Sequence, residues 1–190
     1  MIKDLEAAIG YRFQNITLLQ NALTHSSYAN ERWHNSLLSN ERLEFLGDSV
    51  LNMLAAEHLY TAYPELPEGE LTKLRASVVC ETSLYTVALA ADLGKYLLLG
   101  KGEDANGGRN RASILADATE ALIAAIYLDG GLEAAREFII PRLQENIKTA
   151  VAAEFYNILT SVAFWCSEKQ SHNIVNTAVF INCLAERYEI

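Results

Sequence analysis

Hydrophobic positions recur at helical spacing from the N-terminus to about residue 150. Capping residues, glycines and prolines divide this pattern into segments. The expected helices cover residues 4–9, 15 or 17–23, 40–60, 69–78, 82 or 83–94, 113–129 and 132–150. A polar segment, residues 28–40, separates the second of these helices from the third, and the Gly-rich run 100–111 is expected to be a plain connecting loop. Because this part of the chain shows no strand-like alternation, the sequence predicts an all-α fold.

The helix expected over residues 40–60 carries an acidic wall. At about 100° per residue, Glu44 and Asp48 fall within about 60° of Glu41. The apolar side chains expected on the opposite wall are Leu43, Leu46, Val50, Met53 and Leu54. An acidic stripe on an amphipathic helix is usually a solvated face, so this helix alone does not identify a site.

The helix expected over residues 113–129 is less ordinary. Between Ser113 and Leu128 its strongly polar interior residues are Asp117, Thr119 and Glu120. A helix that is apolar nearly all round is usually buried, and burying two unpaired carboxylates costs several kcal/mol or forces them to be neutral. If the two acidic helices meet, cations would neutralise the pooled charge. Hard oxygen ligands favour Mg²⁺, with Mn²⁺ able to substitute.

Phe45 lies about 40° from Glu41, on the acidic side of its helix. An aromatic side chain beside a charged wall either contacts a second copy of the chain or lies under a neighbouring helix. His25, in Thr24-His25-Ser26, fits a capping or loop role better than a catalytic one.

The composition is that of a globular protein, with 51% hydrophobic and 21% charged residues in 190. The net charge of −9 argues against nucleic acid as a partner, although a metal-binding acidic cluster would account for part of it. Basic residues near the motifs could form a local phosphate-facing surface; they are Arg42, Lys73, Arg75, Lys101, Arg109 and Arg111. The three cysteines show no pairing pattern and the N-terminus is charged, so we expect a cytoplasmic protein. The sequence has no apolar run as long as a membrane helix.

The segment 40–51, Asn-Glu-Arg-Leu-Glu-Phe-Leu-Gly-Asp-Ser-Val-Leu, resembles the signature of ribonuclease III, the double-stranded-RNA endonuclease. Further segments resemble the family in the same order along the chain. They are Ala22–Tyr28, Leu66–Ala76, Leu99–Glu103, Gly107–Arg111, Ser113–Leu122 and Tyr127–Gly131. The resemblance covers roughly residues 1–150 and implies the helical endonuclease-domain fold of that family.

The resemblance also implies residue roles. Glu44, Asp117 and Glu120 match the family's direct metal ligands, and Asp48 and Glu120 match residues with catalytic roles. Glu41 and Glu68 match acidic positions that contribute to the catalytic valley, although Glu68 has acidic neighbours and the alternative for it is a loop carboxylate that reaches no metal. Phe45 matches a phenylalanine that packs into the partner subunit of a homodimer.

Residues 151–190 depart from the family pattern. The family usually continues into a double-stranded-RNA-binding domain, for which about 40 residues are too few, and no such domain is recognisable here. The tail is apolar, with two basic residues against four acidic ones from Glu154 onwards. We therefore expect a catalytic domain over 1–150 and an atypical tail over 151–190, which is truncated, frame-shifted or a natural short form.

The predicted function is a cytoplasmic, homodimeric, Mg²⁺-dependent endoribonuclease. The family's members cut double-stranded RNA, leave 5′-phosphate and 3′-hydroxyl ends, and process rRNA and mRNA. One alternative is a catalytically silent RNA-binding or ribosome-associated protein of the same fold; such proteins usually lose acidic positions, and all six are present here. Another is a defective fragment that folds correctly but binds RNA poorly.

Overall fold

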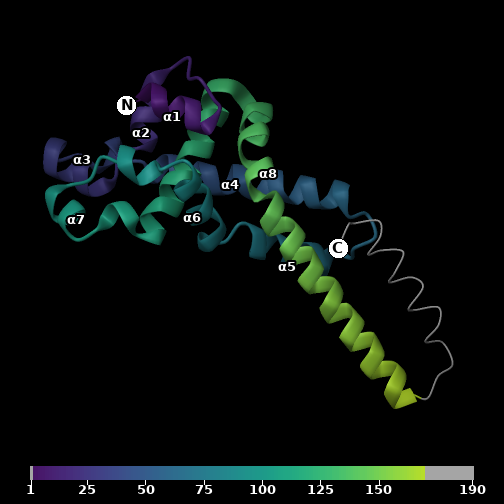
Figure 1. Cartoon of the computed structure of the whole chain (residues 1–190). Coiled ribbons are helices and arrows are strands. Elements are labelled where there is room, and N and C mark those ends of the chain that lie inside the picture. The colour runs from purple at the N-terminus through teal and green to yellow at the C-terminus, as the bar shows by residue number, and fades with distance from the viewer. Residues whose placement is uncertain (1, 170–190) are drawn as a thin grey trace. The chain divides into compact units, whose positions relative to one another are not determined.

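The computed structural model describes residues 2–169, with side chains as far as Ala153 (Figure 1). Its helices are α1 (Ile2–Ile9), α2 (Ile16–Ala22), α3 (Ser26–Trp33), α4 (Glu41–Ala62), α5 (Glu68–Val78), α6 (Glu81–Ala90), α7 (Lys101–Ala105) and α8 (Ala112–Lys169). The short 3₁₀ helices are η1 (Ser36–Leu38), η2 (Leu93–Tyr96) and η3 (Gly108–Asn110). No strand forms in this part of the chain, where Thr24 and Leu98 make an isolated bridge. The predicted all-α fold is confirmed.

The chain divides into two compact units, Met1–Gln144 and Glu145–Ile190. In the second unit the backbone is helical as far as Lys169, so the helix expected to end near residue 150 is longer. The predicted apolar, atypical tail stays a prediction. It depends on side chains beyond Ala153 and on the segment 170–190, which lie outside the described residues. The helices of the described part include no candidate transmembrane span.

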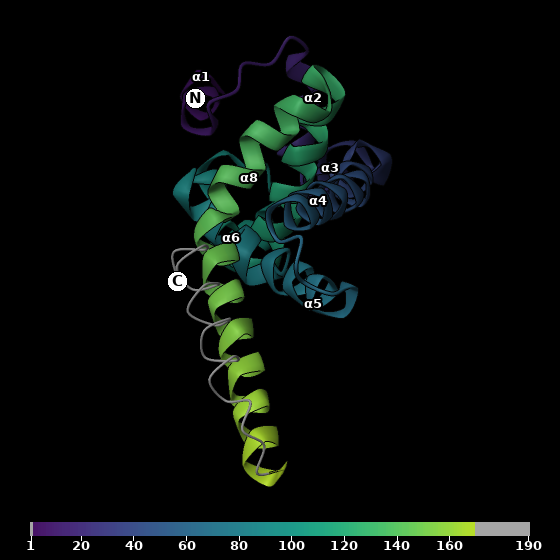
Figure 2. The same ribbon diagram turned by 90° about the vertical axis from the view of Figure 1, so that its right-hand side faces the viewer.

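The first half of α8 forms the centre of the first unit. Ala118, Ala121, Ile123 and Ile126 have no exposed surface, as expected for a helix that is apolar nearly all round. The buried Thr119 places α6 against this helix, because its hydroxyl donates to Leu115 O at 2.8 Å and to Leu84 O at 3.4 Å. Helix α4 packs on α8 as well, and Figures 1 and 2 show it crossing the green start of α8.

A carboxylate in the first half of α8 fixes the N-terminal segment. Asp129 accepts hydrogen bonds from the Tyr11 hydroxyl at 2.9 Å and from the backbone N–H groups of Gln14 and Asn15 at 2.8 and 2.7 Å. A Cβ at Gly130 would overlap the Tyr11 hydroxyl. Gly131 has φ +84°, which separates two helical stretches of α8 where the sequence predicted a stop.

Two short helices form where the sequence predicted none. They are α3 and η1, and they lie within or at the edge of the polar segment 28–40. Helix α3 buries Ala29 completely, and Tyr28 packs edge-to-face on Trp33 at 5.4 Å. A short helix with one fully buried position leaves little periodic signal in an otherwise polar sequence.

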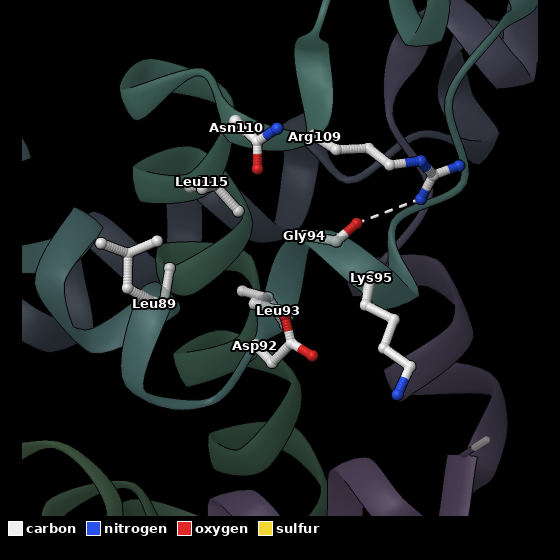
Figure 3. Close-up of a pocket in the computed structure, with 9 residues that line it drawn as sticks. Leu89, Asp92, Leu93, Gly94, Lys95, Arg109, Asn110 and Leu115 are labelled. Carbon is white, nitrogen blue, oxygen red and sulfur yellow. Dashed lines mark hydrogen bonds between the residues drawn. The ribbon is translucent and has the colours of Figure 1, made fainter.

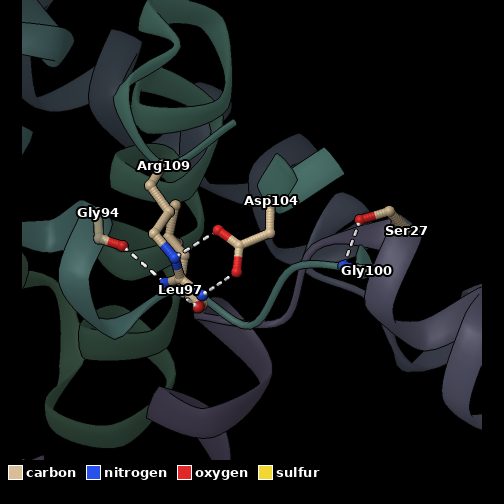
Figure 4. Close-up of polar contacts among 6 residues, drawn as sticks. All are labelled: Ser27, Gly94, Leu97, Gly100, Asp104 and Arg109. Atoms are coloured by element: carbon tan, nitrogen blue, oxygen red, sulfur yellow. Dashed lines mark hydrogen bonds and ion pairs between the residues drawn. The ribbon is translucent and has the colours of Figure 1, made fainter. Parts of the chain in front are cut away.

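The prediction of a plain loop over residues 100–111 is wrong, because α7 and η3 form there. The Arg109 guanidinium organises this segment: it pairs with Asp104 at 2.7 Å and donates to Gly94 O and Leu97 O at 3.0 and 2.7 Å (Figure 4). A further correction concerns α6, which begins after Cys80 rather than at Thr82 or Ser83.

Candidate metal centre

The acidic wall of α4 begins where the chain is tightly held. Asn40 is buried, donates its backbone N–H to Thr24 O at 2.8 Å, and precedes the first residue of the helix, Glu41. Glu41 and Asp48 are exposed, whereas Glu44 is partly buried. On the other side, Leu43, Val50 and Leu54 are buried as the pattern predicts. Met53, expected on the same apolar wall, is instead 46% exposed.

Three carboxylates from two helices converge. One oxygen each of Glu44 on α4 and of Asp117 and Glu120 on α8 lie within 4.8 Å of one another. Oxygens around one octahedral Mg²⁺, at about 2.1 Å from the ion, are separated by roughly 3 to 4 Å. Small side-chain adjustments would therefore let all three carboxylates ligate one cation, and an all-oxygen, triply negative set fits a hard divalent ion.

The close approach of the two helices depends on Gly47. A Cβ built at Gly47 would overlap the backbone carbonyl of Glu120, so any side chain there would push α4 away from α8. Gly47 lies between the carboxylates of α4 in the sequence and is buried. Glycine within a helix costs about 1 kcal/mol relative to alanine, so a glycine inside an amphipathic helix is itself a signal of close packing.

The shared negative charge and burial perturb the three carboxylates. Burial, with the nearby charges of Asp48, Glu44 and Asp117, raises the pKa of Glu120 from 4.5 to about 7. Burial and then Asp117, Glu41 and Asp48 raise the pKa of Glu44. Without a cation, Glu120 is therefore about half protonated at neutral pH, and a bound divalent ion would favour the ionised form.

Burial raises the pKa of Asp117 too, and two residues outside the predicted site act on it. The imidazole of His25 lowers this pKa, whereas Glu81 at the start of α6 raises it. Neither residue was predicted as part of the site. Glu81 follows a mostly apolar stretch with no motif, and His25 gave only a capping signal.

The other predicted acidic residues lie outside the three-carboxylate group. Asp48 accepts at Oδ1 from the Asn52 amide at 2.8 Å and raises the pKa of Glu120 through its charge. Glu41 accepts from the Ser39 hydroxyl at 3.3 Å. Glu68 is exposed at the start of α5 and accepts from the Thr72 hydroxyl at 3.0 Å. The described part of the chain does not bring Glu68 into the group.

Phe45 is 79% exposed, the largest exposed fraction of any large hydrophobic residue in the described part of the chain. It shares its turn of α4 with Glu44 and Asp48. The sequence left two alternatives for this ring, cover by a neighbouring helix or contact with a second copy of the chain. Because a helix of the same unit does not cover the ring, a contact from outside the unit would be needed to bury it.

A separate cavity of about 260 Å³ lies between the end of α6, η2 and the start of α8 (Figure 3). Its polar groups include Asp92, Lys95 and Arg109, but the guanidinium of Arg109 is turned onto Gly94 O and Asp104. None of the acidic residues predicted for the site lines it.

Comparison with known proteins places the chain in a family. A family model described as ribonuclease-III-like matches residues 15–147. Ribonuclease 3 of Clostridium tetani is 52% identical over 153 residues, which are 80% of this chain and 64% of the relative. Ribonuclease 3 of Caldanaerobacter subterraneus subsp. tengcongensis is 53% identical over 82% of this chain and 68% of its own. The chain spans less than two thirds of the length of the C. tetani relative.

A solved structure gives the same assignment. The nuclease domain of ribonuclease III from Campylobacter jejuni, described as flexible in the region involved in dimer formation, superposes with a TM-score of 0.71 at 40% identity. That match covers 77% of this chain and 98% of the solved one. The acidic segments of α4 and α8 fall inside the matched region of the family model. The chain therefore belongs to the ribonuclease III family.

Proposed function

We propose that this chain is an endoribonuclease that hydrolyses double-stranded RNA with the help of divalent cations held by Glu44, Asp117 and Glu120. The convergence of three carboxylate oxygens within 4.8 Å of one another carries the proposal. Family membership supports it, since the similar proteins are ribonucleases by name. The cation, Mg²⁺ or Mn²⁺, would supply a polarised phosphate and an activated water.

The chain's own residues prepare the site for that chemistry. Gly47 lets α4 and α8 approach closely enough to pool the three carboxylates. Asp48 stays exposed beside the group, with Oδ1 held by Asn52. Its second oxygen is then available to accept a proton from, or to orient, the attacking water. Hydrolysis on this pattern would leave a 5′-phosphate and a 3′-hydroxyl, and Glu41 and Glu68 would support the acidic valley.

The proposed assembly is a homodimer in which Phe45 packs against the partner subunit. Its 79% exposure on the acidic side of α4 supports this, because a ring of that size is stabilised by removal from water. The proposed substrates are RNA duplexes, including rRNA and mRNA precursors. Cytoplasmic location stays a prediction.

The rival function is that of a catalytically silent, RNA-binding or ribosome-associated member of the family. A member that no longer cleaves has no use for a self-repelling group of carboxylates, and here Glu44, Asp117 and Glu120 are kept within ligating reach of one another. The geometry therefore favours the enzyme.

The test is cleavage of a long RNA duplex by this chain with Mg²⁺ and with a chelator. Glu120→Gln keeps the size of the side chain but removes its charge, and we expect cleavage to fall by orders of magnitude while the fold persists. Glu137→Gln makes the same chemical change at an exposed position of α8 and should cleave like the parent. Cleavage that is insensitive to chelation, or normal cleavage by a folded Glu120→Gln, would contradict the proposal.

A further inference from the structure

His25 uses one of its two ring nitrogens to hold the fold. As the residue before α3, it accepts the backbone N–H of Ser27 at Nδ1, at 3.2 Å, in place of the usual short polar N-cap side chain. The Ser27 hydroxyl oxygen also lies 2.8 Å from Nδ1. The cap therefore accounts for Nδ1 and leaves Nε2 without a structural role.

The hydrogen-bond network fixes the tautomer of this histidine. The backbone N–H of Gly100 donates to the Ser27 hydroxyl oxygen at 2.9 Å (Figure 4). The backbone N–H of Ser27 can only donate, so Nδ1 of His25 is an acceptor, and the Ser27 hydroxyl proton therefore points to Nδ1 as well. With Nδ1 accepting, the neutral ring carries its proton on Nε2.

Backbone contacts hold His25 between the start of α4 and the segment before α7. Its N–H donates to Leu98 O at 3.1 Å, and the carbonyl of the preceding Thr24 accepts from Asn40, one residue before α4. The imidazole is half-buried, and it acts electrostatically on Asp117, where it opposes the rise in pKa that burial causes. Within the described part of the chain Nε2 has no hydrogen-bond partner, and it is not sealed from solvent.

We propose that the Nε2–H of His25 is a substrate-binding group that donates a hydrogen bond to a phosphate oxygen of the RNA strand beside the metal centre. This inference rests on the proposed function, because it takes the RNA backbone to lie along the three carboxylates. Nε2 carries a proton in this neutral tautomer and in the charged ring alike, so the donor is present in either state. The fixed tautomer presents the donor without reorganisation when the substrate arrives.

Two substitutions separate the donor from the cap. Asparagine is a favourable N-cap residue, so His25→Asn should keep the bond from Ser27 N–H while losing the distal donor. Glutamine is a poor N-cap residue, but its longer side chain carries an amide N–H₂ towards the position of Nε2. We expect His25→Asn to melt near the parent and to lose about tenfold or more in kcat/KM on a long RNA duplex, as for a lost hydrogen bond to a charged group. His25→Gln should melt lower and recover most of kcat/KM.

Binding without cleavage provides a second readout. In the Glu120→Gln background, fluorescence anisotropy with a labelled duplex should show weaker binding for His25→Asn by a similar factor. With Glu120 intact and no RNA present, Mn²⁺ should bind the parent and the His25→Asn variant equally well, because His25 ligates no metal.

The outcomes separate this inference from the proposed function. If the parent neither binds nor cleaves the duplex, the proposed function fails and takes the His25 assignment with it. If the parent cleaves and His25→Asn cleaves and binds equally well, only the assignment of His25 fails. A His25→Gln variant as defective in kcat/KM as His25→Asn would also overturn it, because the distal donor would then not matter.

Discussion

Replacing Glu120 by glutamine should stabilise the cation-free protein at alkaline pH. The pKa of Glu120 is about 7 in the fold, against 4.5 for the ordinary side chain. Because this pKa is higher in the folded than in the unfolded state, the folded state binds the proton more tightly. The free energy of unfolding therefore falls as the pH rises from about 4.5 to about 7. Glutamine is neutral throughout and removes this loss.

The size of the effect follows from the pKa difference. At about 1.36 kcal/mol per pKa unit, ionising Glu120 would cost the folded state roughly 3 kcal/mol. Because the side chain is only partly buried, solvent screening reduces this to about 1–2 kcal/mol. For a chain of this size the corresponding change in Tm is about 2–8 °C.

The assay is a thermal melt of the parent and of Glu120→Gln at pH 5 and pH 8, with a chelator present. The Tm of Glu120→Gln relative to that of the parent should rise between pH 5 and pH 8. The Tm of Glu137→Gln relative to the parent should stay the same. Adding Mg²⁺ at pH 8 should raise the Tm of the parent more than that of Glu120→Gln, because the ion binds only the folded site. An equal pH dependence for the parent and Glu120→Gln would refute the reasoning.

Three further substitutions test the arrangement around the site. Gly47→Ala should destabilise the fold by about 1–3 kcal/mol and abolish cleavage, because the added Cβ meets the Glu120 backbone. The control Gly102→Ala has open space around its Cβ and should change neither the stability, measured by thermal melts, nor the cleavage rate. Phe45→Ala should shift the protein towards monomer in sedimentation, and a parent that is already monomeric at micromolar concentration would contradict the proposed interface. Asp129→Asn should lower the Tm, since one amide oxygen replaces two carboxylate oxygens that accept three hydrogen bonds, and an unchanged melt would show that this contact does not stabilise the N-terminal segment.

Helical periodicity predicted most of the fold because α4 buries one continuous face and the first half of α8 is apolar and buried nearly all round. Helix α4 and the first half of α8 lie close to where the pattern places them, and the apolar character of α8 correctly indicated its burial. The short helices α3 and α7 were missed. They bury few side chains. Helix α3 is held instead by its His25 cap and α7 by the pairing of Asp104 with Arg109, which are contacts that periodicity does not reveal.

The acidic residues of the candidate centre could be listed from the sequence, but their geometry could not. Periodicity places Glu44 on one helix and Asp117 and Glu120 on another, yet it does not say that these helices touch. The contact between Gly47 and the backbone of Glu120 supplies that information. The tautomer of His25 could not be predicted either, because it follows from the hydrogen bonds that the folded cap of α3 sets between Nδ1 and Ser27.

Direct binding of Mn²⁺ tests the central claim, that Glu44, Asp117 and Glu120 form a divalent-cation site. Electron paramagnetic resonance of a Mn²⁺ titration, at pH 8 and without RNA, measures free ion directly. The account predicts saturable binding by the parent and by Glu137→Gln, with binding weakened at least tenfold in Glu44→Gln and in Glu120→Gln. Binding that survives both substitutions in folded protein would contradict the account.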